Sequence, residues 1–314
     1  MNRFSRFLTG LVAAPHTPIS ADGAVNPSVV SRQADILISN GISGAFICGS
    51  TGESHSLTTA ERMIIGEAWR SAIGSRKLKL IVHAGHNSIE DARALAAHGA
   101  RIKADAIAMM APCYYKPGSV EDLIEFCAPV AAAAPGLPFY FYDIPALTGV
   151  NVSMPDFLKK GAARIPNLAG LKFTTSNFMS LQQCLEAEHG QFNILFGVDE
   201  MLLGALALGV HGAVGSTYNY AAPLYLKIIA AFEAGDLATA RALQLKSVKL
   251  VEALCQCGVL PGGKALMSLL GADCGPVRPP VRNLTEEQRE RLFSQVRALG
   301  VMDESMSERV LKAK

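Results

Sequence analysis

The sequence predicts a closed (β/α)8 barrel in the α/β class, followed by a C-terminal helical extension. Eight short apolar runs alternate with segments of helical periodicity before residue 232, and after it the periodicity is helical only. A doubly wound open sheet is the alternative, but no glycine-rich dinucleotide fingerprint follows the first strand. We therefore assign residues 1–232 to a TIM barrel and residues 233–314 to a three-helix extension packed on it.

Strands are expected where an apolar run is short and ends in turn-forming or polar residues. Runs of this kind are typical of parallel sheets, in which both faces of a strand are covered. The expected strands are residues 8–14, 44–48, 78–83, 106–110, 138–142, 167–172, 193–196 and 212–214.

Helices are expected where apolar residues recur at helical spacing. A capping box, Thr58-Thr59-Ala60-Glu61, opens one of them, and a similar pattern at residues 285–288 opens the last. The expected barrel helices are residues 29–39, 58–73, 88–98, 120–134, 177–189, 200–208 and 223–232. The three helices of the extension are expected at residues 236–255, 261–270 and 285–299.

Composition and charge exclude several classes of protein. The chain has 314 residues, a net charge of +2 and no basic block, so we expect neither nucleic acid nor a membrane surface as partner. No apolar run reaches the roughly 18 residues of a membrane span, and residues 1–10 lack the apolar core of a signal peptide. Seven scattered cysteines indicate reduced thiols, and hence a cytoplasmic protein.

No metal site is predicted. Cys255 and Cys257 are separated by one residue and no second pair accompanies them, so we interpret them as core residues. His83 and His86 follow the third expected strand, but they have no evident third ligand. We interpret them as loop or core histidines.

Lys172 stands in an otherwise apolar run, at the end of the sixth expected strand. Taking an ammonium out of water is costly, so burial favours the neutral amine. A neutral amine attacks ketones and aldehydes to give a Schiff base. Alternatively, Lys172 ends the strand and its ammonium reaches water along a flexible stem. This run alone leaves both interpretations open.

Polar residues also follow the other expected strands, at the ends that form the active-site face of a (β/α)8 barrel. Ordinary turns, core aromatic residues and favourable first-turn charge would each explain one of these segments. On one face they would together provide hydroxyls, a phenol, an amine and carboxylates. The segments are Gly49-Ser50-Thr51-Gly52-Glu53, Pro112-Cys113-Tyr114-Tyr115, Tyr142-Asp143-Ile144-Pro145, Gly197-Val198-Asp199-Glu200 and Gly215-Ser216-Thr217-Tyr218-Asn219.

At three motifs the chain resembles the pyruvate-dependent Schiff-base aldolases, a family that includes dihydrodipicolinate synthases and N-acetylneuraminate lyases. The motifs lie at residues 49–53, 142–145 and 170–172, and the resemblance extends from residue 15 to residue 280. It implies that Lys172 forms the Schiff base and that neither a metal nor a dissociable cofactor is needed.

The resemblance also implies roles for three further catalytic residues. Tyr142 would shuttle protons, and Ser50 would hydrogen-bond its phenol. Tyr114 matches a tyrosine near the proton relay that is often contributed across a subunit contact. The resemblance therefore implies a homo-oligomer, with a tetramer as the family's usual state.

The branch of the family depends on the second substrate. Leu147 stands where the synthases carry an arginine that holds a carboxylate, and leucine cannot form a bidentate pair. Residues 144–150, 196–200 and 215–219 look like the lyases. The resemblance then implies reversible cleavage of N-acetylneuraminate to pyruvate and N-acetylmannosamine. The pyruvyl carboxylate would lie on Ser50 and Thr51, and the sugar pocket would comprise Thr174, Gly197, Asp199, Glu200, Gly215 and Ser216.

Two alternatives stay open beside the sugar-cleaving activity. One is a related pyruvate-dependent aldolase or dehydratase that acts on 2-keto-3-deoxy sugar acids or on a hydroxy-oxoglutarate, with the same lysine and tyrosine. The other is a non-catalytic barrel that binds keto acids, which the presence of both residues disfavours. One departure from the family is Asp143, where relatives often carry asparagine. It would place an extra potential charge near the phenol.

Overall fold

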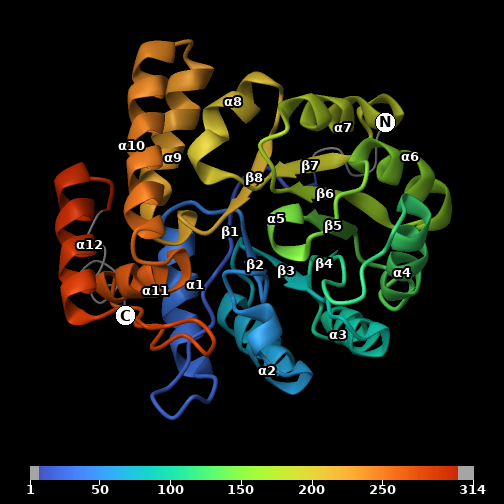
Figure 1. The fold of residues 1–314 in the computed structure, drawn as a ribbon, viewed down its shortest axis with the longest axis horizontal. Helices are drawn as coiled ribbons and strands as arrows, with labels where there is room; N and C mark the ends of the chain where they lie inside the picture. The colour runs from blue at the N-terminus through green and yellow to red at the C-terminus, as the bar shows by residue number, and fades with distance from the viewer. Residues whose placement is uncertain (1–6, 303–314) are drawn as a thin grey trace.

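A computed structural model describes residues 7–302 and confirms the predicted barrel (Figure 1). Eight parallel strands close in chain order, so that β1 pairs with both β2 and β8. Every predicted strand is present, with small differences at its ends. The strands are β1 (Gly10–Ala13), β2 (Gly44–Ile47), β3 (Lys79–His83), β4 (Ala106–Met110), β5 (Phe139–Asp143), β6 (Leu168–Phe173), β7 (Asn193–Phe196) and β8 (Gly212–Gly215).

Helices surround the barrel, and short 3-10 helices interrupt three of the loops. The 3-10 helices are η1 (Pro27–Val29), η2 (Ser54–Ser56) and η3 (Asp199–Met201). The α-helices that follow the strands are α1 (Val30–Ser39), α2 (Thr59–Ile73), α3 (Ile89–Arg101), α4 (Val120–Ala132), α5 (Pro145–Thr148), α6 (Met154–Arg164), α7 (Phe178–Gly190), α8 (Leu202–Ala207) and α9 (Tyr218–Glu233).

The three helices predicted after the barrel are present as α10 (Leu237–Cys255), α11 (Val259–Leu269) and α12 (Glu286–Leu299). They lie together on one side of the barrel, in orange and red in Figure 1. Buried residues of these helices, such as Leu250, Leu266 and Leu292, belong to the same apolar cluster as the barrel helices. A division into two domains at residue 232 stays a prediction.

The sequence analysis placed no helix between β5 and β6, where the structure has α6. This helix has ordinary start signals: the Ser153 side chain accepts a hydrogen bond from the Asp156 amide, and Pro155 lies in the first turn. The start of α9 was also predicted too late. Pro223 lies inside α9, after a non-helical residue at Ala221, rather than at its first turn.

Alternation along the strands sorts the apolar residues into two clusters. The larger cluster packs between the strands and the surrounding helices. The smaller one fills the barrel and includes Val12, Phe46, Ile81, Tyr142 and Val214. The inside of the barrel is therefore a packed core, and its last layer faces the C-terminal ends of the strands.

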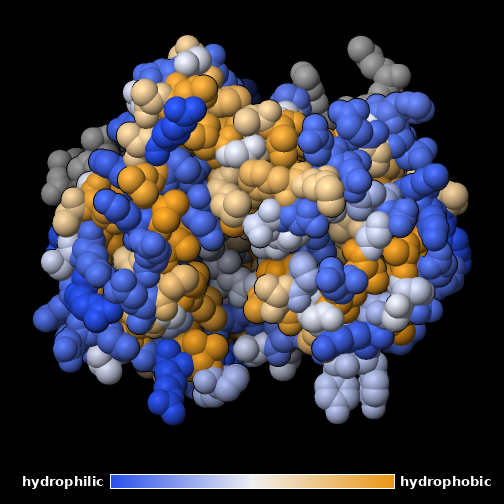
Figure 2. All heavy atoms as spheres, turned by 45° about the horizontal axis from the view of Figure 1, so that its top comes forward, coloured by the Kyte–Doolittle hydropathy of each residue, from blue (hydrophilic) through white to orange (hydrophobic). Residues whose placement is uncertain are grey.

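The outer surface mixes residue types. Figure 2 shows hydrophilic and hydrophobic residues interspersed over one face, which is hollowed near its centre. Among residues 7–302, none of the helices combines the length and the apolar character that crossing a bilayer requires.

Candidate active site

A bulge in β6 turns Lys172 into the barrel. Leu168 and Gly170 pair with successive residues of β5, so Ala169 has no partner of its own. An extra residue reverses the alternation of a strand. Ala169 therefore faces the interior and Leu171 the helices, while Lys172 faces the interior again.

The glycine of the Gly-Leu-Lys motif is required by a close approach. A Cβ on Gly170 would lie 1.9 Å from the carbonyl oxygen of Asn193 on β7, so a larger residue would push the two strands apart. The motif thus has a physical reason: the glycine permits the bulge that aims the lysine.

The Lys172 side chain is buried, with 5% of its surface exposed. Its Nζ lies 3.9 Å from the centroid of the Tyr142 ring and 4.6 Å from that of Phe46. Among residues 7–302 its amine makes no ion pair and no hydrogen bond. The prediction that Lys172 is withdrawn from water is confirmed. The sequence analysis missed Phe46, although alternation within residues 44–47 points its side chain inward.

Tyr142 is held among aromatic rings at the C-terminal end of β5. Its hydroxyl lies 3.3 Å from Ser50 Oγ, as the resemblance implied. Phe46 packs against it edge to face at 5.6 Å, and His83 does so at 6.0 Å. These contacts leave the phenol oxygen pointing toward the 49–53 loop.

His83 is a core histidine, as predicted. It is fully buried, and burial holds the pKa of its ring well below the ordinary value, with the Arg62 guanidinium adding to the effect. Its Nε2 accepts a hydrogen bond from the Met110 amide, so Nδ1 carries the proton and donates to the Cys48 carbonyl at 3.0 Å. His86 is half-buried in the loop that follows.

The 49–53 loop is a tight turn flanked by two residues with a left-handed backbone. Cys48 and Glu53, on either side, have φ angles of 56° and 59°, which are unusual for residues other than glycine. A Cβ on Gly52 would lie 3.0 Å from the backbone of Cys48, so the loop folds tightly back on itself. Ser50 and Thr51 are half-buried at its tip. Hydroxyls and backbone amides there can receive a carboxylate.

Asp199 is buried beside β8, and one of its carboxylate oxygens is bonded to Thr217. Its Oδ2 accepts hydrogen bonds from the Thr217 amide at 2.9 Å and the Thr217 hydroxyl at 2.6 Å. Burial raises the pKa of Asp199 to about 6, against the lowering by those two bonds. A Cβ on Gly215 would lie 1.9 Å from Asp199 Oδ1, so that glycine makes room for the carboxylate. The sequence analysis missed Thr217 as the partner of Asp199.

The other residues predicted for a sugar pocket lie at or just after the ends of neighbouring strands. A Cβ on Gly197 would lie 2.1 Å from Thr174 Oγ1, and within the described chain this buried hydroxyl has no hydrogen-bond partner. Glu200 and Ser216 are half-buried. Among residues 7–302 the Glu200 carboxylate makes no hydrogen bond, so its oxygens are available to ligand hydroxyls.

Among residues 7–302, Tyr114 makes no hydrogen bond or ring contact with these groups. It is 76% exposed and packs edge to face on Tyr115, which is 85% exposed. Leu147, on α5, is also exposed. Large exposed aromatic residues are typical of surfaces that another chain covers.

Asp143 does not lie near the phenol. It follows Tyr142 on β5 and so faces the helices, near the Cys184 thiol on α7, whose pKa is raised mainly by burial and further by the Asp143 charge. Burial raises the pKa of Asp143 itself to about 7. The expectation of an extra charge beside Tyr142 is therefore wrong, because the alternation of the strand directs the side chains of Tyr142 and Asp143 to opposite faces.

The thiols form no metal centre. Among residues 7–302, no group of three histidine, cysteine or acidic side chains could hold a metal ion. Cys255 is exposed and Cys257 half-buried, at and just after the end of α10. The interpretation of Cys255 as a core residue is therefore wrong.

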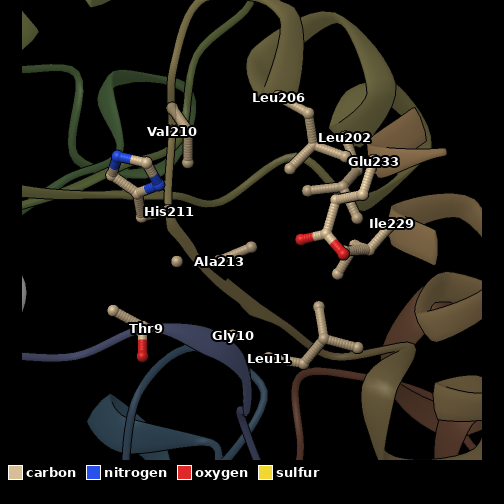
Figure 3. A pocket seen from close by; sticks show the side chains of 11 residues that line it. Thr9, Gly10, Leu11, Leu202, Leu206, Val210, His211, Ala213, Ile229 and Glu233 are labelled. Atoms are coloured by element: carbon tan, nitrogen blue, oxygen red, sulfur yellow. The ribbon is translucent and has the colours of Figure 1, made fainter. Parts of the chain in front are cut away.

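A cavity of about 290 Å³ lies at the opposite end of the barrel (Figure 3). It is bounded by the N-terminal ends of β1 and β8 and by α8 and α9, and most of its lining is aliphatic. Its polar members His211 and Glu233 are exposed. Residues at this end of a (β/α)8 barrel serve stability rather than chemistry.

Comparison with known proteins agrees with this geometry. Residues 7–299 match the dihydrodipicolinate synthetase family. The chain belongs to this family. The N-acetylneuraminate lyase of Rattus norvegicus is 39% identical over 300 residues, covering 94% of this chain and 93% of the relative.

Two solved structures are also similar to this chain. The N-acetylneuraminate lyase of Proteus mirabilis has a TM-score of 0.92 at 40% identity, covering 94% of this chain and 99% of that one. The N-acetylneuraminate lyase (sialic acid aldolase) of Aliivibrio salmonicida has a TM-score of 0.92 at 42% identity, covering 94% of this chain and 98% of that one.

Proposed function

We propose that this protein is a Schiff-base aldolase that reversibly cleaves N-acetylneuraminate to pyruvate and N-acetylmannosamine. The observation that carries the proposal is the buried amine of Lys172, which has no partner among residues 7–302 and lies above the Tyr142 ring in a barrel of this family. Similarity to N-acetylneuraminate lyases over nearly the whole chain supports this choice of substrate.

The reaction begins when the neutral amine of Lys172 attacks the C2 ketone of the open-chain sugar. Tyr142 donates its phenol proton to the departing hydroxyl, so loss of water leaves a protonated imine and a phenolate. The imine withdraws electrons from the neighbouring bond. The Tyr142 phenolate accepts the proton of the C4 hydroxyl while the C3–C4 bond breaks. The electrons of that bond pass to the imine and give an enamine. N-acetylmannosamine leaves as the aldehyde. Protonation and hydrolysis of the enamine release pyruvate and regenerate the amine.

Each end of the substrate has its own partners. The carboxylate lies on the 49–53 loop, where Ser50 and Thr51 provide hydroxyl and backbone donors. Ser50 also supports the phenol of Tyr142 through their 3.3 Å contact. The hydroxyls of the sugar tail meet Asp199 and Glu200, because carboxylates make strong, charge-assisted hydrogen bonds to hydroxyl groups.

The bound sugar tail also passes Thr174 and Ser216. Gly197 leaves room for the Thr174 hydroxyl, and Gly215 leaves room for the Asp199 carboxylate. The imine accepts the electrons that the bond cleavage releases, so the reaction needs no metal and no dissociable cofactor.

We propose a homotetramer in the cytoplasm as the working form. The exposed pair Tyr114 and Tyr115 supports a subunit contact close to the active-site mouth. Through such a contact Tyr114 would reach the proton relay of a neighbouring subunit.

The test is product identification after incubation with N-acetylneuraminate. We expect pyruvate and N-acetylmannosamine in equal amounts, and neither with the Lys172→Ala variant. In the reverse direction, pyruvate is offered with N-acetylmannosamine and with other sugar aldehydes. Preferred condensation with a different aldehyde would contradict the substrate assignment while leaving the aldolase chemistry intact.

A further inference from the structure

Glu53 closes the Gly-Ser-Thr-Gly-Glu motif but takes no part in the proposed reaction. Its carboxylate is withdrawn from water, with 1% of the side chain exposed, and it forms an ion pair at 2.5 Å with Lys264 of α11. The Lys264 side chain is 2% exposed. Removal of both charges from water is costly, and separating the pair would leave each charge buried without a partner. The pair therefore fixes the positions of the two side chains relative to each other.

The two partners also hold the segment that follows α11. Lys264 Nζ donates a hydrogen bond to the Pro276 carbonyl at 2.7 Å. The other carboxylate oxygen of Glu53 accepts one from the Arg278 amide at 2.8 Å. One carboxylate and one ammonium thus join the 49–53 loop, α11 and residues 276–278.

His16 fills the space between α11 and the 49–53 loop. Burial, with the Lys264 charge beside it, lowers the pKa of His16 to about 3, so its ring is neutral at physiological pH. A Cβ on Gly263 would lie 2.5 Å from His16 Nε2, so α11 approaches the ring as closely as glycine allows. The Thr51 backbone, in the 49–53 loop, contacts the same ring and opposes the lowering of its pKa. The His16 ring therefore lies between α11 and the 49–53 loop.

We propose that Glu53 and Lys264 are positioning residues, through which the C-terminal extension sets the geometry of the 49–53 loop and hence the affinity for the substrate carboxylate. The φ of 59° at Glu53 supports this, because a backbone in that region persists only when its surroundings hold it. The inference rests on the proposed function, since it assigns the carboxylate to Ser50 and Thr51.

The test measures how much pyruvate gives half-maximal covalent trapping at Lys172 by borohydride. Glu53→Gln keeps an acceptor for the Arg278 amide, and Lys264→Met keeps the length of the side chain. We expect each to raise the half-saturating pyruvate concentration about tenfold, as for loss of one well-placed hydrogen bond to a charge. The double variant should raise it no further than the larger single effect, because the two residues act as one unit.

The matched control is Glu61→Gln. Glu61 on α2 forms an ion pair with Arg278 at 2.5 Å, so it tethers the same segment without touching the 49–53 loop. Glutamine preserves the capping box that Glu61 makes with Thr58. The control should leave the half-saturating concentration within about twofold of wild type. An equal rise in the control would overturn the proposal, and so would wild-type values in the folded Glu53 and Lys264 variants.

Hydrogen exchange on the wild-type protein covers the case in which those variants do not fold. Trapping pyruvate should increase protection of peptides spanning residues 49–53 and residues 261–278 together. Protection of the first region alone would overturn the proposal. If wild type forms no adduct at all, the proposed function fails as well, which separates that failure from the failure of the positioning role.

Discussion

Two buried lysines lie in contrasting surroundings. Lys264, on α11, has a carboxylate at 2.5 Å and a carbonyl oxygen at 2.7 Å. Lys172, on β6, faces two aromatic rings, and no ion pair to it is found among residues 7–302. Both are almost wholly withdrawn from water, so burial alone does not distinguish a structural lysine from a reactive one.

What distinguishes them is the partner. Burial lowers the pKa of Lys264, and the Glu53 carboxylate opposes that lowering. Glu53 and the Pro276 carbonyl also occupy the donors of the amine, so the side chain is held in place and is not free to attack a ketone. The rings beside Lys172 stabilise a cation without accepting a hydrogen bond from it. That environment leaves the amine without an oxygen partner among residues 7–302, and it can stabilise the positive charge of the imine once that has formed.

The largest expected effect comes from Lys172→Ala. We expect the initial rate of N-acetylneuraminate cleavage to fall by about four orders of magnitude or more, because the covalent path is lost. The melting temperature should not fall through loss of an ion pair, since no ionic partner of the amine is found among residues 7–302. If the variant cleaves N-acetylneuraminate at the wild-type rate, Lys172 is not the reactive lysine.

The next effect is that of Tyr142→Phe, which keeps the ring below the Lys172 amine and removes the hydroxyl. We expect kcat to fall by about 10²–10⁴-fold, the range for loss of a proton-transfer group. Saturable trapping of pyruvate should persist. If trapping is lost while the protein remains folded, the ring and the hydroxyl do not have the separate roles given to them here.

Lys264→Met should show the opposite behaviour to Lys172→Ala. Denaturant unfolding should give a loss of about 3–5 kcal/mol, because Glu53 is left buried without its partner. Adding Glu53→Gln should restore most of the loss. A single variant as stable as wild type would mean that the ion pair does not hold the extension on the barrel.

Asp143 extends the comparison to a buried acid, and among residues 7–302 it has no ion-pair partner. Burial raises its pKa from 3.8 to about 7, so between these values the folded state binds more protons than the unfolded state. Wild-type stability should therefore fall as the pH rises through that window.

Asp143→Asn removes this loss. At pH 8 the variant should be more stable than wild type by a few kcal/mol, on the order that a shift of this size implies. Near pH 4 the difference should disappear. Unfolding curves of both proteins at both pH values check this. If the variant differs from wild type in stability by the same amount at pH 8 and near pH 4, the account of Asp143 as a buried carboxyl group without an ionic partner is contradicted.

The sequence predicted the strands because each is a short apolar run with a local record. The run around Lys172 left the direction of that side chain open, and the resemblance at three motifs implied its role. The sequence could not indicate the partner of each lysine. Glu53 and Lys264 lie far apart in the chain, and Thr217 meets Asp199 only because β7 and β8 are neighbours in the closed barrel. The face on which Asp143 lies depends on the strand register. These features come from contacts across the fold, whereas α6 had local start signals that were overlooked.

The most direct test of the central claim is to treat the protein with pyruvate and borohydride and to locate the adduct by mass spectrometry of its peptides. We predict one reduced pyruvate adduct, on the peptide that carries Lys172, and none on the peptide that carries Lys264. An adduct on Lys264 or on another lysine, or no adduct at all, would contradict the account.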